Sequence, residues 1–235
     1  MQDPHNHPRH IAIILDGNRR FAKRLLLDSS KGHELGVEKI KKLFLWCRDL
    51  GIREITLYAF SMQNFGRAKH EFEFLMNLFE KAFLDACSNE DIHKNKIRVQ
   101  VIGRKHLLPE RVQTAIRKAE EATKEYGDYA INFALAYGGR EEITDAVMKI
   151  ADDAMNNKIS IADIDEKLIS RNLYLDSEPD IIIRTGGDRR TSNFLPWQSV
   201  YSEWFFLDKF WPEFEKEDLI DIVKEFKAKE RRYGK

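Results

Sequence analysis

The sequence predicts a single α/β domain, built on a six-stranded, mostly parallel sheet with helices on both of its faces. Six short runs rich in apolar and β-branched residues alternate with longer amphipathic segments. The runs are apolar at nearly every position, which is typical of parallel strands buried on both faces. At 235 residues the chain has the length of one large domain, and it contains neither an internal repeat nor a Pro/Gly-rich linker. We therefore expect one domain over residues 10–235, preceded by a flexible polar N-terminus at 1–9.

The expected strands share a core of Ile, Val, Leu, Phe or Ala, and most of them end at a glycine or a polar residue. They span 10–15 (HIAIIL), 54–60 (EITLYAF), 98–103 (RVQVIG), 130–137 (AINFALAY), 180–185 (DIIIRT) and 202–208 (SEWFFLD). The segments between them carry apolar residues at helical spacing, and they span 34–50, 69–89, 107–126, 140–155, 162–171 and 215–231. The helix at 69–89 has more apolar residues than one narrow stripe needs. Core packing explains most of them, and a hydrophobic tunnel or a dimer contact is the alternative.

Charge and cysteine content narrow the class of protein. Lys plus Arg and Asp plus Glu number 39 each, so the whole chain has no net attraction for nucleic acid, and any basic site must be local. Two cysteines, Cys47 and Cys87, provide neither a disulfide framework nor a zinc motif, which indicates a cytoplasmic protein. The polar N-terminus is not a signal peptide, and no apolar run is long enough to span a membrane.

Polar and glycine-rich segments follow four of the expected strands. They are LDGNRR, SMQNFGR, AYGGR and RTGGDRRTSNF, after the first, second, fourth and fifth strands respectively. In open α/β sheets, ligands bind beyond the carboxyl ends of the strands. The sequence therefore predicts a binding site where these four segments meet.

The first of these segments has the residues needed to bind a phosphate together with a metal. Gly17 allows close backbone approach, and a helix starting near Asn18 would present free N–H groups to an anion. Arg19 and Arg20 can contact phosphate oxygens through both guanidinium nitrogens. Asp16 would repel phosphate unless a cation lies between them, which favours Mg²⁺. The alternative is a helix-capping aspartate beside two exposed arginines.

The segment after the fifth strand predicts a second anion site. Arg184 precedes a Gly-Gly turn, and Arg189, Arg190 and Ser192 follow it. The chain lacks the GxxxxGK[ST] and GxGxxG motifs of nucleotide-binding loops. The LDGN run is similar to the nucleophile loop of aspartyl phosphatases, but it has Asn18 where those enzymes need a second aspartate. Two anion sites and one metal-binding carboxylate indicate chemistry at diphosphates.

Two further residues are candidates by their position. His33 could contact phosphate, or it could simply begin a helix. Glu203 lies within an apolar strand, where a carboxylate needs a metal or an arginine as its partner.

These motifs together resemble the cis-prenyltransferases, the undecaprenyl diphosphate and dehydrodolichyl diphosphate synthases. The resemblance extends over nearly the whole chain, through HIAIILDGNRRFAK, GHELG, ITLYAFSMQNFGR, NFALAYGGREEI, DIIIRTGGDRRTSNFLPWQSVYSEWFF, FWPEF and ERRYG. The Arg-Arg pair after DGN is more similar to archaeal and eukaryotic members than to bacterial ones. The family implies a hydrophobic tunnel between sheet and helices, a homodimer, and Mg²⁺-assisted condensation of farnesyl or geranylgeranyl diphosphate with isopentenyl diphosphate. A lipid product would be the only route to a peripheral membrane contact.

The resemblance also implies a role for individual residues. Asp16 would bind Mg²⁺, with Glu203 as the second metal carboxylate, and Ser61 and Asn64 would lie near the condensing carbons, Asn64 assisting proton removal. The allylic diphosphate would be bound by Gly17, Asn18, Arg19, Arg20 and His33, with Phe21 at its pocket. The isopentenyl diphosphate would be bound by Arg67, Arg184, Arg190 and Ser192, and Gln63, Phe65 and Thr191 complete the expected substrate contacts.

Several positions depart from the family pattern. Ser29 replaces an arginine, Gln63 an acidic residue, Ala136 an asparagine and Asp188 a glutamate. These changes leave open a family member that makes short products, or one that transfers the prenyl group to another acceptor such as an alcohol. A non-catalytic subunit of a heteromeric synthase is disfavoured, because such partners typically lack the aspartate of DGN and the arginines. A phosphate-binding module without chemistry would leave the apolar helix and Glu203 unexplained.

Overall fold

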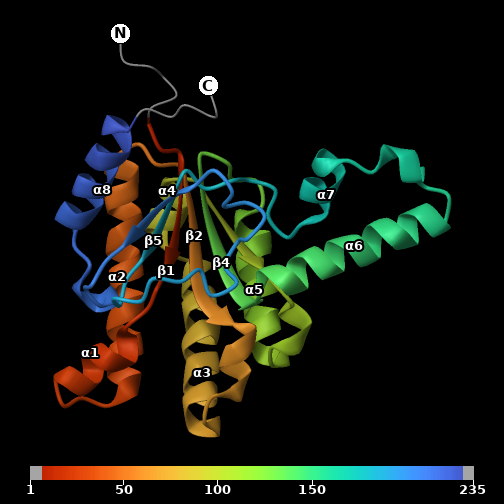
Figure 1. The fold of residues 1–235 in the computed structure, drawn as a ribbon. Coiled ribbons are helices and arrows are strands. Elements are labelled where there is room, and N and C mark those ends of the chain that lie inside the picture. Colours follow the sequence, from red (N-terminus) through yellow and green to blue (C-terminus); the bar gives the residue numbers. More distant parts are fainter. Residues whose placement is uncertain (1–6, 230–235) are drawn as a thin grey trace.

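A computed structural model describes residues 7–229, and it contains a six-stranded sheet in the order β3-β4-β2-β1-β5-β6 (Figure 1). The strands are β1 (His10–Ile14), β2 (Glu54–Ser61), β3 (Ile97–Ile102), β4 (Tyr129–Tyr137), β5 (Ile181–Arg184) and β6 (Glu203–Phe206). All five pairings between neighbouring strands are parallel. The predicted fold class is confirmed, with β1 at the centre of the sheet.

Eight helices connect and cover the strands in the described part of the chain. They are α1 (Asn18–Arg24), α2 (Ser29–Asp49), α3 (Lys69–Ala86), α4 (Glu90–Lys94), α5 (Glu110–Thr123), α6 (Gly139–Met155), α7 (Glu166–Asn172) and α8 (Lys216–Ala228). Short 3₁₀ turns are η1 (Met62–Gly66), η2 (Lys105–Leu107), η3 (Ile161–Asp163) and η4 (Trp211–Glu213).

Successive residues of each buried strand face opposite sides of the sheet. Ile11 and Ile13 of β1 pack with α2 and α8, while Ala12 and Ile14 pack on the other side with Phe194 and neighbouring loop residues. Two-sided burial explains why the strand sequences are apolar throughout. At the β3 and β4 side of the sheet, α3 and α5 form a further core cluster around Phe60.

The helices differ from the sequence expectation at three places. The helix expected at 162–171 is the turn η3 followed by α7, which begins at Glu166 because the Asp165 side chain accepts from the Leu168 N–H. Helix α2 begins at Ser29 rather than near residue 34, because the Asp28 side chain accepts a hydrogen bond from the Ser30 N–H at 2.8 Å and caps the helix there. Helix α4 was not expected; its first turn is capped by the Asn89 side chain, which accepts from the Ile92 N–H.

Two sequence predictions concern the ends of the chain and lie partly or wholly outside the described residues. Of the expected flexible segment, residues 1–6 are outside the description, whereas the Arg9 N–H donates to the Asp180 carboxylate at 2.8 Å. The closing motif ERRYG, at residues 230–234, also lies outside it. Within residues 7–229, no helix has the length and apolar content needed to cross a bilayer.

Helix α6 extends away from the sheet and carries α7 with it, so the two form an arm on one side of the molecule (Figure 1). Val147, Met148 and Met155 of α6 are more than half exposed on this arm, at 53%, 65% and 77%. Helix α1 lies at the opposite side of the molecule, near the carboxyl ends of the strands (Figure 1).

Candidate active site

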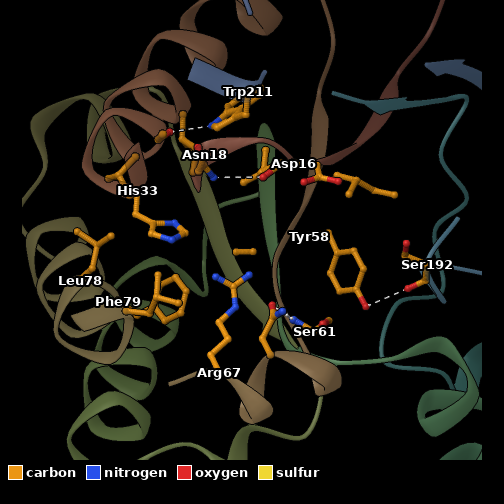
Figure 2. A pocket seen from close by; sticks show the side chains of 18 of the residues that line it. Asp16, Asn18, His33, Tyr58, Ser61, Arg67, Leu78, Phe79, Ser192 and Trp211 are labelled. Carbon is orange, nitrogen blue, oxygen red and sulfur yellow. Dashed lines mark hydrogen bonds between the residues drawn. The ribbon is translucent and has the colours of Figure 1, made fainter. Parts of the chain in front are cut away.

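Two adjoining cavities lie at the carboxyl ends of β1, β2 and β5, where the sequence predicted a site. Their volumes are about 550 Å³ and 530 Å³. Asp16, Asn18, His33 and Arg67 line both of them. Figure 2 shows these four side chains around the larger cavity, with Leu78 and Phe79 of α3 on one side.

Asp16 joins the two predicted anion sites. One of its carboxylate oxygens accepts a hydrogen bond from Arg184 at 2.8 Å, and the other accepts from Arg20 at 3.0 Å. Arg184 is only 3% exposed, and its other guanidinium nitrogen donates to Ser192 at 2.7 Å and to the Arg190 carbonyl at 2.6 Å. The segments after β1 and β5 therefore form one continuous site.

Asp188 is a second carboxylate beside the same arginines. It lies 3.4 Å from Arg20 and 3.8 Å from Arg184, and its ion pair with Arg190 measures 2.8 Å. Hydrogen bonding from Arg190 is the main reason that the pKa of Asp188 is below its usual value. The carboxylates of Asp16 and Asp188 therefore neutralise the arginines of the site.

Glycines of the GHELG motif bring α2 into contact with the loop after β1. A Cβ atom at Gly32 would lie 2.2 Å from the Asn18 carbonyl oxygen, and one at Gly36 would lie 2.7 Å from the Asn18 amide oxygen. The Trp211 indole donates to the Gly36 carbonyl, and the Trp211 backbone N–H donates to the Asp16 carbonyl, both at 2.9 Å. Only glycine permits this approach, so the motif positions Asn18 and Asp16.

Glu71 of α3 contacts three residues of the candidate site, and the sequence analysis did not single it out. It is 7% exposed, pairs with Arg67 at 2.5 Å, and lies 3.6 Å from Arg19 and 3.5 Å from the Nε2 atom of His33. Burial opposes its ionisation, but the two arginines outweigh burial and hold the pKa of Glu71 below its usual value. One carboxylate thus orients three cationic or ionisable groups toward the cavities.

His33 is poised to respond to an anion. Its Nε2 atom is buried and has no hydrogen-bond partner among the described residues. Burial lowers the pKa of His33, and the neighbouring Arg67 lowers it further, with Glu71 opposing both. Burial and Arg67 together therefore favour the neutral imidazole.

Ser61, at the end of β2, lines the larger cavity together with Gln63 and Asn64 of the turn η1. The Asn64 amide oxygen accepts a hydrogen bond from the Ser61 N–H at 3.0 Å, so this oxygen holds the turn in shape. Gln63 makes no ion pair, as expected of an amide in place of the family's acidic residue.

The larger cavity has an apolar side between α2 and α3. Its lining there consists of Val37, Ile40, Leu75, Leu78 and Phe79. The excess apolar residues of the helix at 69–89 therefore serve both the core and a cavity wall next to the charged groups. This arrangement suits a ligand with an anionic head and a hydrocarbon tail.

The structure does not bring every predicted residue to the cavities. Phe21 lies in cation–π contact with Arg24, Phe65 packs edge-on against Phe60, and Thr191 is exposed outside both cavities. Arg190 also lines neither cavity; its side chain is 59% exposed and paired with Asp188.

Glu203 lies at the opposite end of the sheet from Asp16. It pairs in register with Ile181, which pairs with Ile11, and Asp16 is five residues further along, roughly 16 Å in the strand direction. Its partner is Lys229, at 3.1 Å. Asp16 and Glu203 of one chain therefore do not share a metal ion, and the acidic residue in the apolar strand has a lysine as its counterion.

Comparison with known proteins agrees with this geometry. The family described as putative undecaprenyl diphosphate synthase matches residues 14–234. The chain belongs to this prenyltransferase family. Synthases of the family from two archaea are similar over almost the whole chain. The one from Thermococcus kodakarensis is 50% identical over 98% of this chain and 88% of its own length, and the one from Methanocaldococcus jannaschii is 49% identical over 99% and 85%. Both are named tritrans,polycis-undecaprenyl-diphosphate synthase, geranylgeranyl-diphosphate specific.

Solved structures of the family share the fold. Lavandulyl diphosphate synthase from Lavandula x intermedia, in complex with dimethylallyl diphosphate, has a TM-score of 0.92 and 35% identity over 98% of this chain and 100% of its own. A probable undecaprenyl diphosphate synthase from Campylobacter jejuni has a TM-score of 0.80 and 32% identity, over 97% and 99%.

One departure from the family pattern lies at a position with an unusual backbone conformation. Ala136 has a φ of +46°, in the left-handed region that asparagine tolerates better than alanine. It is fully buried and lines neither cavity. The residue at this position therefore sets the backbone conformation rather than the choice of substrate. Ser29 does line the smaller cavity, and Gln63 the larger one.

The donor set suits a magnesium ion that arrives with its substrate. Residues 7–229 contain no group of three His, Cys, Asp or Glu side chains able to hold a metal. Mg²⁺ commonly takes one or two carboxylates together with substrate phosphates and water. Asp16, with its side chain 28% exposed at the junction of the cavities, could provide one such carboxylate.

Proposed function

We propose that this protein is a Mg²⁺-dependent cis-prenyltransferase that extends geranylgeranyl diphosphate with isopentenyl diphosphate units. The observation that carries the proposal is the meeting of two arginine-lined anion sites at Asp16, beside an apolar cavity wall. The names of the archaeal relatives support geranylgeranyl diphosphate over farnesyl diphosphate as the primer.

The charges of the site favour departure of a diphosphate. Arg19, Arg20 and His33 surround the smaller cavity, where the allylic diphosphate would bind, and Arg184 with Ser192 would bind the second diphosphate. When the allylic C–O bond breaks, its electron pair leaves with the diphosphate, and fixed guanidinium groups stabilise the negative charge that develops. Mg²⁺, held by Asp16 and phosphate oxygens, would add charge neutralisation to the same leaving group.

Assays with purified protein test this function. We expect labelled isopentenyl diphosphate to be incorporated into a long prenyl diphosphate when geranylgeranyl diphosphate and Mg²⁺ are present, with loss of incorporation when EDTA removes the metal. Mass spectrometry of the products gives the chain length. No transfer from dimethylallyl, geranyl, farnesyl or geranylgeranyl diphosphate, by folded protein, would contradict the proposal.

The same assay examines a second function. The likeness to lavandulyl diphosphate synthase, together with Ser29 and Gln63 at the cavities, favours a short product as the alternative. A ten-carbon product from dimethylallyl diphosphate, or transfer to an alcohol, would establish it.

His33 gives a pH dependence to diphosphate binding. A bound diphosphate favours the protonated imidazole, so binding raises the low pKa of His33 and takes up a proton. Linkage then requires the affinity to increase as the pH falls. We expect the affinity for inorganic diphosphate to rise about three- to tenfold more between about pH 8 and pH 6 in the wild type than in His33→Gln. Isothermal titration calorimetry measures this affinity at each pH. If the affinity changed with pH equally in the wild type and in His33→Gln, proton uptake at His33 would be excluded.

We further propose that the protein is a homodimer in the cytoplasm. The apolar residues exposed on the α6–α7 arm, Val147 and Met148 among them, support a contact between copies. Two free cysteines agree with a reducing compartment. Light scattering is expected to give twice the chain mass of 27.6 kDa. Met148→Lys should raise the dimer dissociation constant about tenfold or more, because it places a charge in the contact; an unchanged constant would exclude this surface.

A further inference from the structure

Three consecutive leucines follow helix α1 and have no place in the core. Leu25 is 49% exposed, Leu26 is 96% exposed and Leu27 is 44% exposed. Apolar residues scattered singly on a surface need no explanation, but three adjacent ones at a helix end form a continuous apolar tip. We call Leu25, Leu26 and Leu27 the leucine tip.

The backbone conformation at the leucine tip is one that leucine does not favour, so the fold alone does not explain why leucine is present. The Leu26 N–H donates to the Lys23 carbonyl at 3.1 Å, and the Leu27 N–H donates to the Ala22 carbonyl at 2.9 Å. This is the Schellman ending of a helix, in which the residue at the position of Leu26 is left-handed and is usually glycine. Leu26 has a φ of +57°, a conformation that is unfavourable for leucine. Neither backbone geometry nor internal packing accounts for its side chain.

The surroundings of the leucine tip are basic. Residues 19–31 contain five Lys or Arg and one acidic residue, although the chain as a whole is neutral. Four of the five have a carboxylate partner: Arg19 pairs with Glu71, Arg20 with Asp16, Arg24 with Glu213 and Lys31 with Glu34. Lys23 makes no ion pair with any residue in the described range. Leu27 and Lys23 also line the smaller cavity, so the tip adjoins the opening of the anion site.

We propose that the leucine tip docks this protein on a bilayer containing anionic lipids. The leucines enter the boundary between headgroups and acyl chains, and the neighbouring cations contact lipid phosphates. An interface with a second copy is disfavoured for this surface, because the exposed apolar residues of the α6–α7 arm lie at the other side of the molecule (Figure 1). Docking would bring the smaller cavity to the bilayer surface, where a prenyl tail resides; this last consequence rests on the proposed function.

Vesicle flotation of the full chain, without substrate, tests the proposal. We expect the wild type to bind vesicles of phosphatidylglycerol and phosphatidylcholine at least about tenfold more tightly than vesicles of phosphatidylcholine alone. Leu26→Asn should reduce binding to the anionic vesicles roughly tenfold or more, since it removes the most exposed apolar side chain. Asparagine tolerates the left-handed conformation, so the thermal midpoint of this variant should be equal or higher.

A matched variant and two further readouts keep the test specific. Leu107→Asn alters another exposed leucine, in η2, and should bind vesicles as the wild type does. The proposal would be overturned if the wild type bound vesicles with and without phosphatidylglycerol equally tightly. It would also be overturned if Leu26→Asn bound the anionic vesicles as tightly as the wild type does. A change of oligomeric state in Leu26→Asn would overturn it too, because it would identify the tip as a contact between copies. The rate of prenyl transfer by Leu26→Asn in detergent solution should equal that of the wild type. Because the flotation assay contains no substrate, its outcome does not depend on whether the protein transfers prenyl groups.

Discussion

Asp16→Asn is expected to lower kcat/KM for prenyl transfer by about 10³-fold or more, since the loss of a metal-binding carboxylate removes several kcal/mol of leaving-group stabilisation. The asparagine side chain keeps the shape of the aspartate but not its charge. Asp16 is the nearest carboxylate to the buried Arg184, with Asp188 a weaker partner at 3.8 Å. The variant should therefore also lose about 1–3 kcal/mol of unfolding free energy. Steady-state kinetics and denaturant unfolding measure the two effects.

Asp188→Asn is the matched control for this variant. It removes a carboxylate that lies beside the same arginines, 3.4 Å from Arg20 and 3.8 Å from Arg184. If Asp16 acts through the metal, Asp188→Asn should retain turnover within about tenfold of wild type, because it alters only the charge around the arginines. Equal losses in the two variants would mean that Asp16 acts solely as a counterion for the arginines.

Gly32→Ala is expected to have the second large effect. The added methyl group would lie 2.2 Å from the Asn18 carbonyl oxygen, so α2 must move away from the start of α1. Overpacking of this kind lowers the unfolding free energy by about 1–3 kcal/mol. Displacement of Asn18 should also weaken the binding of inorganic diphosphate about tenfold or more, as misplaced binding groups do.

Gly127→Ala provides the comparison, because a Cβ atom there has no neighbour within 4 Å. We expect unchanged diphosphate affinity and a change of less than about 0.5 kcal/mol in unfolding free energy. Wild-type affinity in folded Gly32→Ala would show that close packing of α2 on Asn18 is not needed for binding.

Much of the fold followed from the sequence because the strands are short, apolar and separated by helices of strong periodicity. All six strands were placed within a few residues, since burial on both faces leaves a continuous apolar signal. The start of α2 was misplaced because its first turn, from Ser29, is polar and depends on the cap at Asp28. Helix α4 has only five residues, too few to show a helical period.

The site was predictable where its chemistry follows a strand directly. Arg184 ends β5 and Asp16 closely follows β1, and parallel strands bring such ends together; Arg20 lies in the first turn of α1, which the loop after β1 positions beside Asp16. Glu71 was missed because a glutamate in a helix rich in charge normally faces solvent. The arginine four residues earlier, Arg67, was the available signal. The family resemblance assigned Glu203 to the metal, and the sequence could not reveal that Lys229, 26 residues later, pairs with it at 3.1 Å.

The hydrogen bonds around the loop after β1 set the order in which the site can form as the chain is synthesised. Asp16 obtains its partner Arg184 from 168 residues later, and its carbonyl is bonded by Trp211, which is later still. At about 5–20 residues per second, the ribosome adds the residues between Asp16 and Trp211 in roughly 10–40 s. Throughout this time a nascent chain has its DGN motif and Arg20 complete but lacks the Trp211 N–H, and for most of it the chain also lacks Arg184. A fragment that stops before Trp211 should consequently contain all six strands and yet bind no diphosphate.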